Sequence, residues 1–176
     1  MADPPPDPDR DAVERYLAGE GEPAFLELYE RHTPALFQFA LRVVGGSTAD
    51  AEDAVQEAWL RASRRLEEFR WDSTLRTWLM GFTLNCAREV LRRRQRRRRD
   101  GKAAAAGAAS PPTTLAVVDL ERALARLPED FRIAVILHDV EGFTHAEIGR
   151  LLGIEEGTSR SRLHRARRAL RPLLRP

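Results

Sequence analysis

The sequence predicts an all-α protein of two small helical domains joined by a flexible linker. Apolar residues recur every three or four positions along most of the 176 residues, and they do not show the two-residue alternation of a half-buried strand. A stretch rich in alanine, glycine and proline interrupts this pattern. We therefore expect a disordered or short helical N-terminus at 1–20, a helical domain at 21–99, a flexible linker at 100–115, and a four-helix helix-turn-helix domain at 116–176.

The N-terminal part is expected to be disordered over its first nine residues. These contain four prolines and three aspartates, a composition that does not support a packed core. Residues 11–18 are a candidate for one short helix.

Three helices are expected in the domain at 21–99. The first begins near Pro23, bends at Pro34 and ends at a pair of glycines. Ser47 with Asp50 is a start signal for the second helix, and the third begins at Leu75. The predicted buried sides of the second and third helices are Ala51, Ala54, Val55, Ala58, Trp59, Ala62 and Leu66, and Leu75, Trp78, Leu79, Phe82, Cys86 and Val90.

The last third of the chain has the features of a helix-turn-helix. Thr144 and Glu147 fit a capping box, and Gly153 fits the left-handed end of the same helix. Thr158 can cap or begin the next helix, which carries five arginines and no acid. DNA is the leading candidate partner, because a positive helix can pair with phosphates and base edges in a groove. A helical hairpin with a solvated basic face fits the same residues.

Composition and motifs argue against several classes of protein. Cys86 is the single cysteine and lies on a predicted apolar side, which excludes an intramolecular disulfide and disfavours a nucleophile. The four histidines have no paired metal-binding spacing, and the sequence has no phosphate-binding glycine loop. No apolar run approaches the roughly 20 residues of a membrane span. We expect a cytoplasmic protein with no catalytic residue, no cofactor and no metal.

Two further surfaces could bind a partner. The second helix gathers acidic side chains beside Gln56, which either a basic protein partner or simple solvation would explain. The segment FRWDSTLRTWL, at 69–79, places aromatic residues beside cations just before Asn85 and Arg88. Such a combination suits single-stranded nucleic acid, where a base stacks on a ring and cations hold phosphates. Phe69 could equally cap the core, and Trp78 lies on the apolar side.

Six segments of the chain together resemble an extracytoplasmic-function (ECF) sigma factor of bacterial RNA polymerase. They are AFLELYERHTPALFQFALRVV, DAEDAVQEAWLRA, FRWDSTLRTWL, NCAREVLRRR, LPEDFRIAVILHDVEGFTHAEIGRLLG and GTSRSRLHRARRAL, and they cover most of residues 24–170 apart from the linker. The resemblance implies a transcription initiation factor without enzymatic activity. It would bind core polymerase at the β′ clamp and the β flap, recognise the minus-ten and minus-thirty-five promoter elements and promote melting. It also implies an anti-sigma factor as a partner.

The resemblance assigns a role to each candidate surface. The acidic side of the second helix would dock on the β′ clamp through Asp50, Asp53, Gln56 and Glu57. The minus-ten element would be bound and opened, with capture of a flipped base, by Phe69, Trp71, Arg76, Asn85 and Arg88. The minus-thirty-five element would be read by Arg160, Ser161, Arg162, His164, Arg165 and Arg168.

Three residues depart from the family pattern. Trp71 stands where the family usually has glycine, and Gly81 stands where it often has arginine, which implies an unusual minus-ten loop and one missing phosphate contact. Ser159 replaces a usual valine or isoleucine, which should weaken packing under the recognition helix by about 1 kcal/mol. Two alternative functions are a stand-alone helix-turn-helix repressor, which needs a dimer and a palindromic operator, and a helical adaptor with a solvated basic face.

Overall fold

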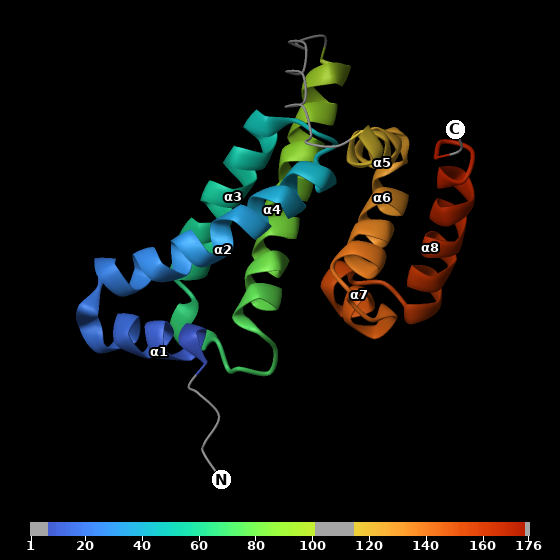
Figure 1. The fold of residues 1–176 in the computed structure, drawn as a ribbon. Helices are drawn as coiled ribbons and strands as arrows, with labels where there is room; N and C mark the ends of the chain where they lie inside the picture. Colours follow the sequence, from blue (N-terminus) through green and yellow to red (C-terminus); the bar gives the residue numbers. More distant parts are fainter. Residues whose placement is uncertain (1–6, 101–114, 175–176) are drawn as a thin grey trace.

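The computed structural model describes residues 7–100 and 115–174, and every regular element within these two ranges is a helix (Figure 1). The all-α prediction is confirmed. The expected linker at 100–115 lies almost entirely outside the described residues. Seen in Figure 1, the helices before it form one group and those after it form a second group alongside.

The N-terminal helix α1 (Pro8–Arg15) begins earlier than predicted and continues into the turn η1 (Tyr16–Glu20). The expectation of disorder is therefore wrong for residues 7–9. Asp7 caps the helix by accepting from the backbone N–H of Asp9. The Asp9 carboxylate lies 2.7 Å from Arg31 Nη1 and 3.0 Å from His32 Nε2, which fastens α1 to the next helix.

The first domain is built from α2 (Glu22–Val43), α3 (Thr48–Ser63), the short turn η2 (Leu66–Glu68) and α4 (Leu75–Arg99). Pro34 lies inside α2, and Gly45 and Gly46 follow its end with φ of +77° and +89°. Ser47 caps α3 by accepting from the Asp50 N–H.

The buried side of α3 agrees with the prediction, whereas that of α4 is wider than predicted. Trp78, Phe82 and Val90 are only partly buried, and α4 also buries Met80, Leu84, Ala87 and Leu91. The reason is that residues of the second domain join the same core. These are Ile133, Ile136, Leu137, Phe143 and Ile148.

The second domain consists of α5 (Leu115–Arg126), α6 (Glu129–Val135) with its continuation η3 (Ile136–Val140), α7 (His145–Leu152) and α8 (Glu156–Leu170). The capping box of Thr144 and Glu147 is present, and Gly153 ends α7 in the left-handed conformation. Thr158 neither caps nor begins α8, because the helix starts at Glu156 and the Ser159 N–H already bonds to the Glu155 carbonyl at 3.1 Å.

Arg132 joins the two domains from a buried position. Its Nε donates to the Val43 carbonyl at 3.0 Å, and its Nη1 donates to the Leu127 carbonyl at 3.2 Å. A Cβ at Gly45 would lie at an ordinary contact distance of 3.6 Å from Arg132 Nη1, so the positive φ of Gly45 rather than a lack of space favours glycine there. Burial lowers the pKa of Arg132. The second domain therefore packs against the first and does not fold around an isolated core.

Candidate nucleic-acid and protein interfaces

Helix α8, the predicted recognition helix, presents a basic outer face. Its apolar side is buried as predicted, through Leu163, Ala166 and Leu170. The outer side chains are exposed and comprise Arg160, Ser161, His164, Arg165 and Arg168. Arg160 pairs with Glu156 one turn earlier on the same helix.

Arg162 differs from the other predicted minus-thirty-five residues. Its Nη2 lies 3.0 Å from Asp130 Oδ2, and its side chain is only 25% exposed. The structure thus turns Arg162 toward α6, whereas its neighbours face solvent.

Ser159 stands where valine or isoleucine is usual, and its surroundings differ from the packing defect that was predicted. The residue is fully buried, and its hydroxyl lies 3.0 Å from Nδ1 of His145 at the start of α7. A buried hydroxyl with a partner avoids most of the cost of desolvation. The expectation of a packing defect is therefore corrected, because the serine exchanges an apolar contact for a hydrogen bond.

A row of aromatic rings runs from the loop before α4 along that helix. The ring centroids of Trp71 and Phe69 are 4.7 Å apart, those of Phe69 and Trp78 are 5.2 Å apart, and those of Trp78 and Phe82 are 4.7 Å apart. All four side chains are partly buried. Phe69 therefore packs against the core and against Trp71 and Trp78, and its role in stacking a base stays a prediction.

Trp71 adopts a conformation that suits the glycine usual in the family. Its φ is +60°, in the left-handed region that is costly for a bulky side chain. The guanidinium of Arg10 lies over its ring, 5.1 Å from the centroid, in a cation–π arrangement. Helix α1 thus contacts the loop that precedes α4.

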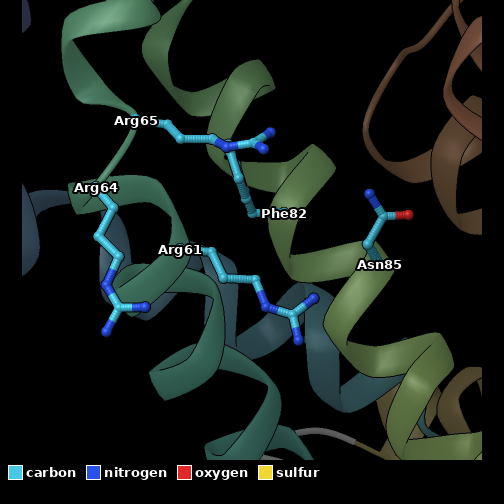
Figure 2. Close-up of a pocket in the computed structure, with 5 residues that line it drawn as sticks. All are labelled: Arg61, Arg64, Arg65, Phe82 and Asn85. Atoms are coloured by element: carbon cyan, nitrogen blue, oxygen red, sulfur yellow. The ribbon is translucent and has the colours of Figure 1, made fainter.

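A cavity of about 360 Å³ lies between α3 and α4 beside Asn85 (Figure 2). Arg61 and Arg65 extend from the α3 side toward α4, which carries Phe82 and Asn85. Arg64 also lines it. These three arginines were not predicted from the sequence, although their position within eight residues of Phe69 is a signal that could have identified them.

Arg61 is held in place by two carboxylates. Its Nε lies 2.7 Å from Glu57 Oε1, and its other two nitrogens lie 2.7 and 2.8 Å from the two oxygens of Glu89. These contacts raise the pKa of Arg61 and lower that of Glu89. Arg61 therefore lines the pocket with a fixed side chain whose charge is already paired with Glu57 and Glu89.

Some polar side chains on the acidic side of α3 are held in ion pairs, and others are exposed to solvent. Asp50 lies 3.3 Å from Arg94 and Glu57 is held by Arg61, whereas Asp53 and Gln56 are exposed. A cavity of about 230 Å³ between α3 and α4 is lined by residues that include Asp53, Gln56, Glu57, Leu60, Cys86 and Val90. Leu60 is 54% exposed and is an apolar contact point that the sequence analysis did not identify.

Two predicted minus-ten cations are paired with carboxylates of the second domain. Arg76 Nη2 lies 2.8 Å from Glu141 Oε2, and Arg88 Nε lies 3.9 Å from Glu129 Oε1. The Arg88 Nε atom is buried and forms no hydrogen bond with any described residue. A Cβ at Gly81 would lie 3.4 Å from Leu151 Cδ1, so this position also lies against the second domain.

Two kinds of feature were not found among the residues described, 7–100 and 115–174. No group of three or more histidine, cysteine, aspartate or glutamate side chains is arranged to hold a metal ion. Within the same ranges no helix combines the length and the apolar character that crossing a membrane requires.

Comparison with known proteins gives a consistent family. The family described as Sigma-70 region 2 matches residues 28–97, and that described as Sigma-70, region 4 matches residues 118–170. The ECF sigma factor SigM of Mycobacterium tuberculosis is 36% identical over 167 residues, which cover 94% of this chain and 84% of SigM. The ECF sigma-E factor of Escherichia coli is 32% identical over 187 aligned positions, which cover 95% of this chain and 96% of that protein.

The solved structures agree in fold across both domains. The sigma factor RpoE in complex with the anti-sigma factor NepR, from Bartonella quintana, superposes with a TM-score of 0.74 at 30% identity and covers 85% of this chain and 96% of its own. CnrH in complex with the cytosolic domain of CnrY gives 0.66 at 28% identity and covers 96% and 97%. The chain therefore belongs to the ECF sigma factors, a family of transcription initiation factors.

Proposed function

We propose that this chain binds core RNA polymerase, recognises the minus-ten and minus-thirty-five elements of a promoter and promotes opening of the DNA. The observation that carries the proposal is the cavity beside Asn85, where arginines and an aromatic row lie next to an exposed amide. This combination provides stacking, cation and base-edge contacts for an unpaired nucleotide. A transcription initiation factor would meet such an unpaired nucleotide when promoter DNA opens.

Opening of the minus-ten element is the task proposed for the first domain. Extrusion of a base from the stack costs a few kcal/mol, which a preformed pocket can offset. Phe69 and Trp71 offer ring faces, Asn85 offers both a donor and an acceptor, and Arg64 and Arg65 offer cations for the backbone. The bound strand would run along the aromatic row toward the pocket.

Reading of the minus-thirty-five element is the task proposed for α8. The exposed side chains of Arg160, Ser161, His164 and Arg165 would meet bases or phosphates in the major groove, with Arg168 further along the same face. Arg162 would contribute mainly through its pair with Asp130, unless DNA displaces that contact.

The surface proposed for core polymerase is the cavity of about 230 Å³ between α3 and α4. Asp53 and Gln56 are exposed beside Leu60, so a basic helical partner such as the β′ clamp would meet both charge and apolar surface. The second domain would contact the β flap. We place the protein in the cytoplasm, where polymerase acts.

Promoter binding would require the two domains to separate in part. Arg76 and Arg88 face Glu141 and Glu129 in the structure, so DNA phosphates would have to replace these carboxylates. RpoE was solved in complex with the anti-sigma factor NepR, and CnrH in complex with the cytosolic domain of CnrY. We propose that this chain has such a partner as well, and that it covers the same surfaces.

Gel filtration with core polymerase, followed by selection of bound sequences from random duplexes, tests the proposal. Co-elution and enrichment of two spaced elements are expected. A chain that does not co-elute would refute the sigma reading. Dimerisation with enrichment of a palindrome in the absence of polymerase would favour a repressor, and a lack of any DNA enrichment would favour an adaptor.

A further inference from the structure

A partly buried polar contact joins the first turn of α8 to α7. His145 is the first residue of α7, and its Nδ1 lies 3.0 Å from the hydroxyl of Ser159. The ring of His145 stacks on His138, with centroids 4.6 Å apart and an angle of 28° between the planes. Ser159 is fully buried, so water cannot replace His145 as the hydrogen-bond partner of its hydroxyl.

The same contacts continue to a later turn of α8. His138 Nδ1 lies 2.9 Å from Asp139 Oδ1, and Asp139 accepts from Arg167 Nε at 3.0 Å and from Arg167 Nη2 at 2.5 Å. These contacts lower the pKa of Asp139, so its carboxylate is ionised and can only accept. His138 must therefore donate from Nδ1. The series begins at Ser159 and ends at Arg167 on the same helix, roughly two turns apart.

We propose that His145 is a positioning residue for the recognition helix, acting through Ser159 to fix the rotation of α8 in the DNA groove. The inference rests on the proposed reading of the minus-thirty-five element by α8. The apolar side of the helix, at Leu163, Ala166 and Leu170, holds its middle and end. At the beginning of the helix a small serine gives little apolar contact, and a hydrogen bond restricts rotation more than a sliding apolar contact does.

The position of the contact connects it to base reading. Arg160 directly follows Ser159, and His164 and Arg168 lie further along the exposed face. A small rotation about the helix axis at Ser159 moves these side chains relative to the base edges. Loss of the contact should therefore reduce discrimination between sequences more than it reduces total affinity, because phosphate contacts tolerate small shifts.

The charged groups around His145 make its contact with Ser159 depend on pH. Burial and the nearby His138, Arg160 and Arg167 lower the pKa of His145 from its ordinary value of 6.5, and Glu156 opposes them. A histidine with a lowered pKa in the folded state contributes stability that is present above the ordinary value and is lost as the pH falls. A protonated His145 can still donate from Nδ1 to the Ser159 hydroxyl. Sequence discrimination should therefore be full at neutral pH and should fall only as the pH passes below the lowered pKa of His145, where Arg160 and Arg167 repel the charged ring.

Two matched substitutions separate the hydrogen bond from the ring. His145→Asn keeps a polar atom near the place of Nδ1 and removes the ring, whereas His145→Phe keeps a ring and removes the nitrogen. The full-length chain with core polymerase is first used to select a minus-thirty-five duplex. The ratio of affinities for that duplex and a scrambled duplex is then measured for each variant between pH 5.5 and 8.

We expect the Asn variant to retain the ratio and the Phe variant to lose it roughly three- to tenfold, the range for one lost hydrogen bond. Equal ratios, or loss in the Asn variant alone, would overturn the proposal in favour of ring packing. Ser159→Ala provides a second test, with the same loss expected and an unchanged ratio contradicting it. Failure of the wild-type chain to select any sequence would instead refute the proposed reading by α8.

Discussion

Removal of one interdomain charge should expose the minus-ten surface. Glu141→Gln keeps the size of the side chain and removes the charge that faces Arg76 at 2.8 Å. The Glu141 side chain is 5% exposed and that of Arg76 is 53% exposed, so solvent screens one side of the pair. We therefore assign the charge about 1 kcal/mol, below the range for a fully buried ionic hydrogen bond.

The ion pair stabilises only the state in which the two domains are packed together, because Arg76 and Glu141 part when the domains separate. A loss of about 1 kcal/mol shifts the equilibrium toward separated domains about fivefold, and binding that requires separation strengthens by the same factor. The assay is fluorescence anisotropy of a labelled single-stranded minus-ten oligonucleotide at fixed salt. Glu30→Gln, on the exposed surface of α2, is the control for the change in net charge. Equal affinities of the two variants would refute the reasoning.

Four further outcomes follow from the structure. Asp53→Arg should weaken binding to core polymerase roughly tenfold with unchanged circular dichroism, and unchanged affinity would exclude this docking site. Arg160→Ala should reduce minus-thirty-five preference by about 1–3 kcal/mol, whereas a uniform loss across sequences would indicate a phosphate contact. Burial raises the pKa of Cys86 to about 11, so iodoacetamide at pH 8 should label it only after unfolding, and rapid labelling of the folded chain would contradict its burial. Because the pKa of Glu89 is lowered, its stabilisation is present above the ordinary value of 4.5 and is lost as the pH falls, so Glu89→Gln should flatten the acid limb of stability measured by urea unfolding.

The parts of the fold that were predicted correctly depend on neighbours close in sequence. The capping box at Thr144 and Glu147, the left-handed Gly153 and the Ser47 cap each involve residues three or four positions apart, or one backbone conformation. Such signals can be read directly from the order of residues. The start of α1 was missed although Asp7 and Pro8 are local start signals, because the proline-rich composition favoured disorder, and the contacts of Asp9 with Arg31 and His32 lie more than 20 positions away.

The ion pairs of the candidate site residues could not be predicted from the sequence, and the roles of these residues stay predictions. The contact of Arg132 with the Val43 carbonyl spans 89 positions, and that of Arg76 with Glu141 spans 65. No local pattern encodes such a distance, so a single sequence did not show that the second domain covers part of α4. Ser159 is a related case, since the rule for apolar positions predicted a defect and the actual partner, His145, lies 14 positions earlier.

Run-off transcription reconstituted with core polymerase tests whether this chain directs initiation at a promoter. The template carries the two elements obtained by selection, and matched templates have either element scrambled. Our account predicts a discrete transcript that requires this chain and that weakens when either element is scrambled. A transcript of equal yield from core polymerase alone, or no transcript with the chain bound to polymerase, would contradict the account.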